Sequence, residues 1–269
     1  MIKVHLVNYE QGMGIDGILS KYANKMAEEL EKLGVAVSVS AQPEPADINH
    51  HINYYSYVPS GTIDTLQITH IWEGDRLEKL KKGIKTATGI CFSKETEEFL
   101  RSKGIETTTI LPAHDGYPRK KKRVCILTNV YPNGCKREGM FYELLGNIDR
   151  SKFHFYIMGK NWNVDGLNMT LIEKFNPLDY AEILNKCDYC LYFGLDEGSM
   201  GVLDAKQVGM KIIAPLQGFH KEIGIDYPFD TQKELNKIFK DLEFNPVESW
   251  TWNNYCLQHK KLWEKLKER

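Results

Sequence analysis

Asp196-Glu-Gly-Ser-Met-Gly-Val-Leu-Asp204-Ala-Lys-Gln-Val-Gly209 lies between two apolar runs, Tyr189-Cys-Leu-Tyr-Phe193 and Ile212-Ile-Ala214. Continuous apolar runs are typical of strands that a parallel sheet buries on both faces. The loop glycines let backbone approach a ligand closely, and Met200 to Val208 predicts a helix whose first amides are unpaired. Open α/β sheets bind ligands at the carboxyl ends of their strands. The segment therefore predicts a parallel α/β sheet with a ligand site at this loop.

Two carboxylates, Asp196 and Asp204, stand eight residues apart across the loop and the first helical turns. An ionised carboxylate only accepts hydrogen bonds, and its two oxygens suit a vicinal diol better than a phosphate. Glu197 can take the first acidic role through a one-residue slip. An ordinary loop with two solvated acids is the other interpretation.

This segment resembles the acidic-x7-acidic signature of the family-four glycosyltransferases, which are retaining enzymes of the GT-B fold. The usual signature has Glu at both ends, whereas this chain has Asp. The resemblance implies an α/β chain with two Rossmann-like domains facing each other across a cleft. It also implies that Asp196 or Glu197 contacts the hydroxyls of a donor sugar and that Asp204 holds the ribose. The donor would be a nucleotide sugar such as a UDP- or GDP-sugar, with no further cofactor.

Composition sets the class of protein. The 269 residues are 42% hydrophobic and 26% charged with a net charge of -1, which suits one or two soluble globular domains and argues against a nucleic-acid binder. No apolar run approaches the roughly 20 residues of a spanning helix, and Met1 leads into a strand, so we expect a cytoplasmic protein. Cys187-x-x-Cys190 has no matching second pair, and a strand would turn these residues to opposite faces, so we expect no metal or redox site.

Near the N-terminus, Gly12-Met-Gly-Ile-Asp-Gly17 is a literal G-x-G-x-x-G. A dinucleotide fingerprint calls for an acid after the second strand, but the predicted strand Val35 to Val39 is followed by Ser40-Ala-Gln42. An NAD(P)-dependent oxidoreductase that uses these glycines stays as an alternative. The family resemblance instead places Gly12 and Gly14 near the donor phosphates and the acceptor.

A histidine is the candidate from the first domain. Leu66-Gln-Ile-Thr-His-Ile-Trp72 predicts a buried strand that ends in Thr69-His70. By resemblance, His70 contacts the donor sugar, and a core histidine is the alternative. His50 and His51 alternate along an earlier strand, so at most one of them can face a site.

The domain boundary is predicted at the segment Ala113 to Arg123, where Gly and Pro precede the basic run Arg119 to Arg123. Residues 1–117 would form the acceptor-side domain and 118–249 the nucleotide-sugar domain, with helix 250–269 packing back on the first. The basic run is either a solvated hinge or a peripheral contact with anionic lipid at the inner face of a membrane.

Two adjacent cations, Lys136 and Arg137, precede a predicted helix, and such a pair forms an anion site. By resemblance, Lys136 occupies the place of the family lysine that binds the donor diphosphate, and Arg137 replaces the family arginine, since Asn129 occupies its place. A solvated cationic pair is the other interpretation. The resemblance adds Gly159 to the nucleotide pocket. It also assigns the diphosphate to loop and helix amides at Gly198, Met200, Gly201 and Val202.

The predicted reaction is transfer of a sugar to a hydroxyl of a carbohydrate or lipid-linked acceptor, with retention, in glycan, polysaccharide or glycolipid synthesis. The chain has no Asp-x-Asp, so we expect no metal requirement. A non-catalytic two-domain sugar-binding protein remains a further alternative.

Overall fold

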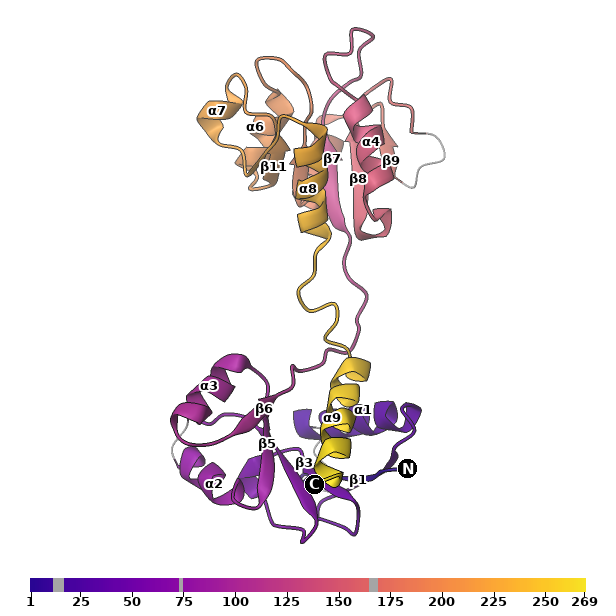
Figure 1. Cartoon of the computed structure of the whole chain (residues 1–269). Coiled ribbons are helices and arrows are strands. Elements are labelled where there is room, and N and C mark those ends of the chain that lie inside the picture. The colour runs from indigo at the N-terminus through magenta and orange to yellow at the C-terminus, as the bar shows by residue number, and fades with distance from the viewer. Residues whose placement is uncertain (12–16, 73–74, 165–168) are drawn as a thin grey trace. The chain divides into compact units, whose positions relative to one another are not determined.

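The computed structural model describes residues 1–11, 17–72, 75–164 and 169–269. The chain divides into two compact units, each with its own parallel sheet (Figure 1). The first unit comprises Met1–Tyr117 and Pro246–Arg269, and the second comprises Pro118–Asn245. Among the described residues, no helix has the length and apolar character that crossing a membrane requires.

In the first unit the sheet has the order β2-β1-β3-β4-β5-β6, with every neighbouring pair parallel. The strands are β1 Lys3–Val7, β2 Ala36–Ser40, β3 Ile48–His51, β4 Ile63–Ile68, β5 Ala87–Cys91 and β6 Thr107–Thr109. The chain leaves β1 toward one side of the sheet and returns on the other side at β3. This reversal is the position at which α/β sheets bind ligands.

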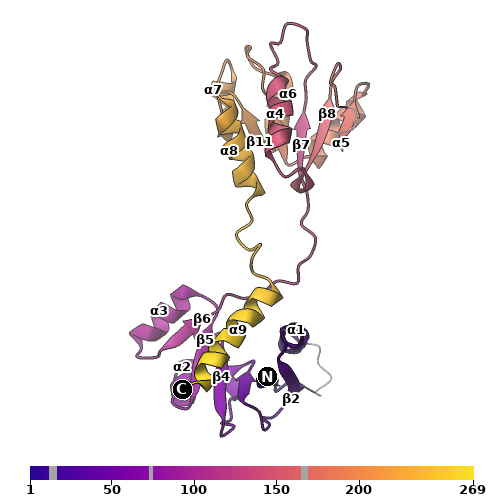
Figure 2. The ribbon, with the colours of Figure 1, turned by 45° about the vertical axis from the view of Figure 1, so that its right-hand side comes forward.

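Helices cover both faces of this sheet. They are α1 Ile18–Lys32, η1 Tyr54–Ser56, α2 Arg76–Gly83, α3 Lys94–Ser102 and α9 Trp252–Lys267. The terminal helix α9 packs beside α1, as Figure 2 shows, so the two ends of the chain share one core. The indole of Trp263 is fully buried and donates to Thr65 Oγ1 at 3.2 Å, and Tyr255 donates to Gln67 Oε1 at 3.0 Å.

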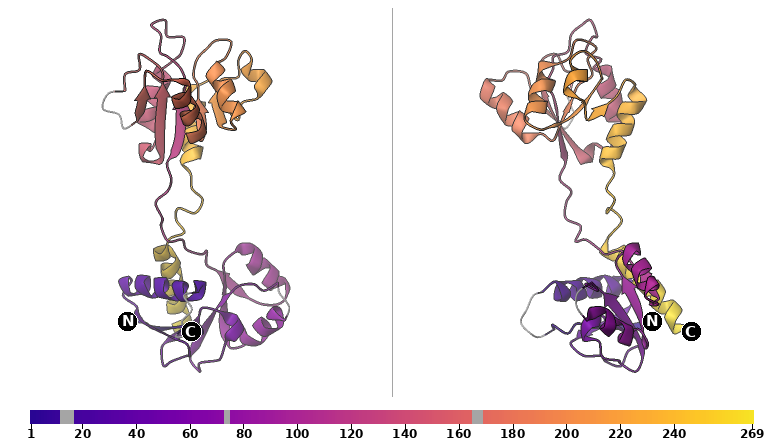
Figure 3. Two further views of the ribbon diagram at one scale, coloured as in Figure 1. Left: turned by 180° about the vertical axis from the view of Figure 1, so that it is seen from behind. Right: turned by 90° about the vertical axis from the view of Figure 1, so that its left-hand side faces the viewer.

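The second unit has the strand order β12-β11-β10-β7-β8-β9. Its strands are β7 Lys122–Ile126, β8 Phe153–Met158, β9 Thr170–Ile172, β10 Tyr189–Leu191, β11 Lys211–Ala214 and β12 Tyr227–Pro228. Its helices are α4 Gly139–Asn147, η2 Arg150–Lys152, α5 Pro177–Lys186, α6 Met200–Gln207, α7 His220–Ile223 and α8 Gln232–Glu243. One face carries α4 and α8 and the other α5 and α6 (Figure 3). From β7 the chain adds β8 and β9 on one side of the sheet, and from β10 it adds β11 and β12 on the other side. The strand order therefore reverses between β7 and β10.

Two Rossmann-like α/β domains are thus confirmed, and three local predictions were wrong. The strand expected to run to Phe193 ends at Leu191, and β4 ends at Ile68, so His70 lies in the following loop. Cys187 ends α5 instead of lying in a strand, and it shares one core cluster with Cys190. All six cysteines are free.

A buried histidine of α9, His259, makes the first unit sensitive to acid. Its Nδ1 contacts the Tyr255 carbonyl at 3.0 Å, its Nε2 has no partner within the described part of the chain, and its ring lies 5.1 Å from that of His50. Burial lowers the pKa of His259 to about 4. Burial, aided by the charges of His259 and His51, also holds the pKa of His50 well below its usual value.

The unfolded chain binds these protons at a pKa of about 6.5, so acid favours unfolding. The stabilisation is complete above about pH 6.5 and is lost as the pH falls toward 4. For His259 alone we expect the free energy of unfolding to be about 2 kcal/mol lower at pH 5 than at pH 7.5, measured by urea denaturation. His259→Phe should flatten this dependence, and an unchanged slope in that variant would contradict the assignment.

Candidate functional site

The candidate site of the second unit lies where its strand order reverses. There, β7 and β10 are hydrogen-bonded neighbours, although the chain continues from them to opposite sides of the sheet. The loop after β7 carries Lys136 and the loop after β10 carries Asp196. In open α/β sheets this reversal opens a crevice at the carboxyl edge.

An ion pair joins these two loops. Lys136 Nζ pairs with the Asp196 carboxylate and donates to the Tyr192 hydroxyl at 2.7 Å. That hydroxyl donates in turn to Asp196 Oδ2 at 2.5 Å, and the Gly198 amide donates to Oδ1 at 3.0 Å. The structure therefore brings two predicted site residues together and adds Tyr192, which the sequence analysis treated as part of an apolar strand.

The pair is charged at neutral pH. Burial alone would raise the pKa of Asp196, but hydrogen bonds from Lys136 and Tyr192 lower it below its usual value. Burial opposes the charge on Lys136, yet Asp196 and Tyr192 raise the pKa of this lysine well above its usual value. Lys136 is thus a partly buried cation at the carboxyl edge of the sheet. Its charge is paired with the Asp196 carboxylate, which an anionic ligand could replace.

Arg137 is directed differently from Lys136. Its Nε donates to the Phe193 carbonyl at 2.7 Å, and one terminal nitrogen lies 3.5 Å from the Asp230 carbonyl. The other terminal nitrogen is buried with no hydrogen-bond partner among the described residues. Burial lowers the pKa of Arg137 below its usual value. The guanidinium therefore supports the end of β10 and does not join Lys136 at Asp196.

The amides at the start of α6 divide into two groups. Those of Gly198 and Ser199 donate to Asp196 and to His220 Nε2, and that of Val202 donates to the Ser199 carbonyl at 3.0 Å. In the part of the chain that the structure describes, the amides of Met200 and Gly201 have no hydrogen-bond acceptor. These two amides remain available for an anion.

Asp204 belongs to a separate group on α6. It accepts a hydrogen bond from Tyr180 of α5 at 2.7 Å, and the Tyr180 ring stacks on Phe175 at 6.0 Å. Glu197 is exposed, and its carbonyl accepts the Phe219 amide at 3.1 Å. Of the two adjacent acids, only Asp196 is bonded to Lys136.

Exposed apolar side chains occur in the segments next to Asp196 and after β11, a feature that sequence reasoning missed. Leu195 is 58% exposed, Met200 65% and Leu216 46%. Gly159, which follows β8, lies so close to the Thr128 carbonyl that any side chain would overlap it. An apolar rim beside fixed polar groups is typical of small-molecule sites.

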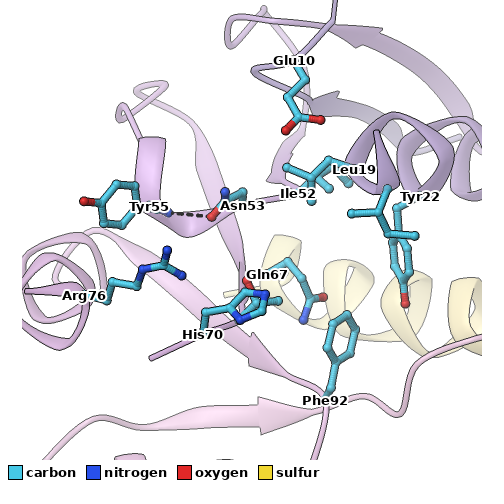
Figure 4. A pocket seen from close by; sticks show the side chains of 12 residues that line it. Glu10, Leu19, Tyr22, Ile52, Asn53, Tyr55, Gln67, His70, Arg76 and Phe92 are labelled. Carbon is cyan, nitrogen blue, oxygen red and sulfur yellow. Dashed lines mark hydrogen bonds between the residues drawn. The ribbon is translucent and has the colours of Figure 1, made fainter. Parts of the chain in front are cut away.

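The first unit has a pocket of about 410 Å³ at the reversal between β1 and β3 (Figure 4). His70 lines it, as do Glu10 from the loop after β1 and Arg76 of α2. Gly12 and Gly14 lie outside the described residues. β2 ends at Ser40, which bonds to His5 and the Gln42 carbonyl.

Strained backbone occurs both next to Lys136 and in the pocket of the first unit. Among the described residues, the non-glycine residues with left-handed φ are His70 (+52°), Arg137 (+47°) and Asn161 (+67°). Asn and His tolerate this region better than most residues, whereas Arg is uncommon there at a cost on the order of 1 kcal/mol or more. Such outliers cluster at functional sites. Among the described residues, no group of three or more His, Cys, Asp or Glu side chains is arranged for a metal ion.

Comparison with known proteins gives weak sequence likeness. No protein-family model matches the chain. The adenylate kinases of Bacillus cytotoxicus and Bacillus mycoides are each 26% identical over 129 residues, which is 48% of this chain and 58% of each relative. The match thus spans little more than half the length of these relatives. The chain has no G-x-x-x-x-G-K-[S/T], because Gly12 and Gly17 are followed by Ile18-Leu19 in place of the phosphate-binding Lys and the hydroxyl residue.

Solved structures that resemble the chain include glycosyltransferases and UDP-sugar epimerases. Anabaena HepE in complex with UDP-glucose is 12% identical, with 95% of this chain and 93% of that chain covered and a TM-score of 0.39. A glycosyltransferase from Rickettsia africae is 9% identical, with 98% of both chains covered and a TM-score of 0.38. The UDP-GlcNAc 2-epimerase from Neisseria meningitidis bound to UDP-GlcNAc is 11% identical, with both chains fully covered and a TM-score of 0.35. TM-scores below 0.5 carry no conclusion about this chain's reaction.

Gly198→Ala should disrupt the loop around Asp196. The φ of Gly198 is +116°, and an added Cβ would lie 2.6 Å from the Phe219 ring. We expect the variant to lower the free energy of unfolding of the second unit by about 1–3 kcal/mol in urea denaturation. Gly139→Ala is the matched control, because a Cβ there meets no atom within 4 Å. Equal stability of the two variants would contradict the loop geometry.

Proposed function

We propose that the chain is a glycosyltransferase of the retaining family-four type, which moves a sugar from a nucleotide-sugar donor to an acceptor hydroxyl. The observation that carries this proposal is the ion pair between Lys136 and Asp196 at the carboxyl-edge reversal of the second sheet. A cation and a hydrogen-bond acceptor lie side by side there, as a sugar diphosphate requires.

Lys136 has the central role in this mechanism. As the bond between sugar and diphosphate breaks, negative charge grows on the departing phosphate oxygens. A positioned cation stabilises that charge without reorganising at the moment of reaction. The donor displaces Asp196 from Lys136: its phosphate pairs with the lysine, and its sugar hydroxyls donate hydrogen bonds to the carboxylate. The amides of Met200 and Gly201 add donors from the start of α6, and Arg137 keeps the end of β10 in place.

The nucleoside is held next to this centre. Asp204 accepts from the ribose diol, since among the described side chains only the Tyr180 hydroxyl is bonded to it. The apolar rim of Leu195, Met200 and Leu216 gives the base a surface. Because Lys136 supplies the positive charge at the diphosphate, the reaction needs no metal ion. The same-face mechanism lets the leaving phosphate take the acceptor proton, so no protein base is required.

The acceptor would be a carbohydrate or a lipid-linked sugar, in the synthesis of a glycan, polysaccharide or glycolipid in the cytoplasm. Contact with the inner face of a membrane through Arg119–Arg123 depends on few side chains. Arg119 donates to the Glu243 carbonyl at 2.7 Å, and Arg123 pairs with Asp188 at 3.1 Å. Arg119, Lys120 and Lys121 are the exposed members of the run, and Arg119 is already bonded to the Glu243 carbonyl.

A nucleoside diphosphate should bind the folded protein without its sugar. We expect one of UDP, GDP or ADP to raise the melting temperature by about 5 °C at a hundredfold excess over Kd, because a ligand that binds only the folded state stabilises it. The measurement is a thermal-shift panel that includes NAD and NADP. A shift with NAD or NADP alone would support the oxidoreductase alternative and move the site to Gly12, Gly14 and Gly17.

Lys136→Ala should lower kcat for sugar transfer by about 10² to 10³ while the protein stays folded. Asp196 keeps its hydrogen bonds from Tyr192 and Gly198 in this variant, so the loop retains its anchor. Transfer is measured by product formation from UDP- and GDP-sugars in the presence of EDTA.

The matched control is Lys237→Ala, which removes an exposed lysine of α8. Unchanged turnover in Lys136→Ala would sink the mechanism. Loss of wild-type activity in EDTA with recovery in Mn²⁺ would refute metal independence. Donor binding without any turnover would favour the non-catalytic sugar-binding protein.

A further inference from the structure

The pocket of the first unit is formed by five separate segments that meet at the carboxyl edge of its sheet (Figure 4). They are the loop after β1, the start of α1, the residues after β3, the segment from β4 into α2, and the end of β5. Its volume of about 410 Å³ lies within the range of small-molecule sites.

One wall of this pocket is apolar and aromatic. Leu19 and Ile52 line it together with the rings of Tyr22 and Phe92, whose centroids lie 5.9 Å apart. The Tyr22 ring is held edge-on by Trp252 of α9 at 4.7 Å. An aromatic wall fixed from behind in this way suits a flat ring or an alkyl group of a ligand.

Glu10 determines which polar group a ligand of this pocket must carry. Its Oε2 is buried and has no hydrogen-bond partner among the residues that the structure describes, and Figure 4 shows the side chain among the pocket residues. A buried acceptor without a partner is destabilising, and a carboxylate can be satisfied only by a donor. Gln67 does not donate to it: its amide donates to the Ile90 carbonyl and its oxygen accepts from Tyr255.

We infer that this pocket binds a molecule with an apolar ring or alkyl body and a hydroxyl group that donates to Glu10. The binding follows from the pocket alone. Its role rests on the proposed function, in which this molecule is the acceptor and Glu10 holds one of its hydroxyl groups. An acceptor of this class carries an apolar group next to that hydroxyl, so a small unsubstituted sugar binds less well.

The test uses two probes with the same flat body. The phenol 4-methylumbelliferone has a hydroxyl proton, and its methyl ether 7-methoxy-4-methylcoumarin has none. Both are titrated calorimetrically into the full chain without nucleotide at about pH 6, where a phenol is protonated. We expect the phenol to bind about tenfold more tightly, because its hydroxyl donates to a charged acceptor. Equal affinity of the two probes would overturn the inference.

Variants test the contribution of Glu10 and the location of the binding site separately. Glu10→Leu should remove the preference for the phenol, and Glu28→Leu, which changes an exposed acid of α1, should keep it. Ile18→Trp should weaken both probes at least tenfold by filling the pocket, and it changes an exposed residue, so folding is not at risk. Trp72→Ala removes an exposed aromatic that does not line the pocket and should change neither affinity. Retained preference in Glu10→Leu would overturn the role of Glu10.

The pocket and the proposed function can fail separately. If the probes discriminate as expected but no nucleotide sugar supports transfer, the pocket stands and the transferase proposal falls. If transfer occurs, and Ile18→Trp and Glu10→Leu leave the acceptor KM unchanged, the pocket inference falls and the transferase proposal stands.

Discussion

The carboxylate of Asp196 holds together two loops that the sheet topology sends in opposite directions. One oxygen receives Lys136 from the loop after β7 and Tyr192 from the end of β10, and the other receives the Gly198 amide of its own loop. Removing charges from water is costly unless each is paired and hydrogen-bonded. Here both conditions hold in the free protein, so a ligand that displaces the carboxylate must supply an equivalent set of contacts. A ligand meets this condition when it has an anionic group for Lys136 and hydroxyl groups for Asp196.

The loop that carries this carboxylate is supported from behind by the loop between β11 and α7. His220 accepts the Ser199 amide at 3.1 Å, and the Phe219 amide donates to the Glu197 carbonyl at 3.1 Å. The Phe219 ring occupies the space beside Gly198. The position of Asp196 is therefore set by backbone contacts to a neighbouring strand connection. A ligand can exchange the partners of Lys136 without remodelling the loop.

Local patterns in the sequence account for much of this site. The apolar runs on either side of Asp196 and Asp204 predicted the strands, and the glycines between them predicted a loop close to other backbone. The inward direction of Arg137 was not predictable, because it depends on a left-handed backbone and on carbonyls of Phe193 and Asp230, which are far away in sequence. Tyr192 was hidden for a similar reason. An apolar run does not show that the strand ends one residue before it, and its ring is buried while its hydroxyl reaches the loop.

The two units place opposite chemistry at equivalent positions of their sheets. At its reversal the second unit has a half-buried lysine and two open helix amides, which favour phosphate. At its own reversal the first unit has an aromatic wall and a carboxylate oxygen with no partner among the described residues, which favour a hydrogen-bond donor on an apolar body. Ile18 and Leu19 line that pocket where a phosphate-binding loop would have its lysine and hydroxyl residue. At these two positions the first unit therefore lacks the side chains with which such a loop binds phosphate.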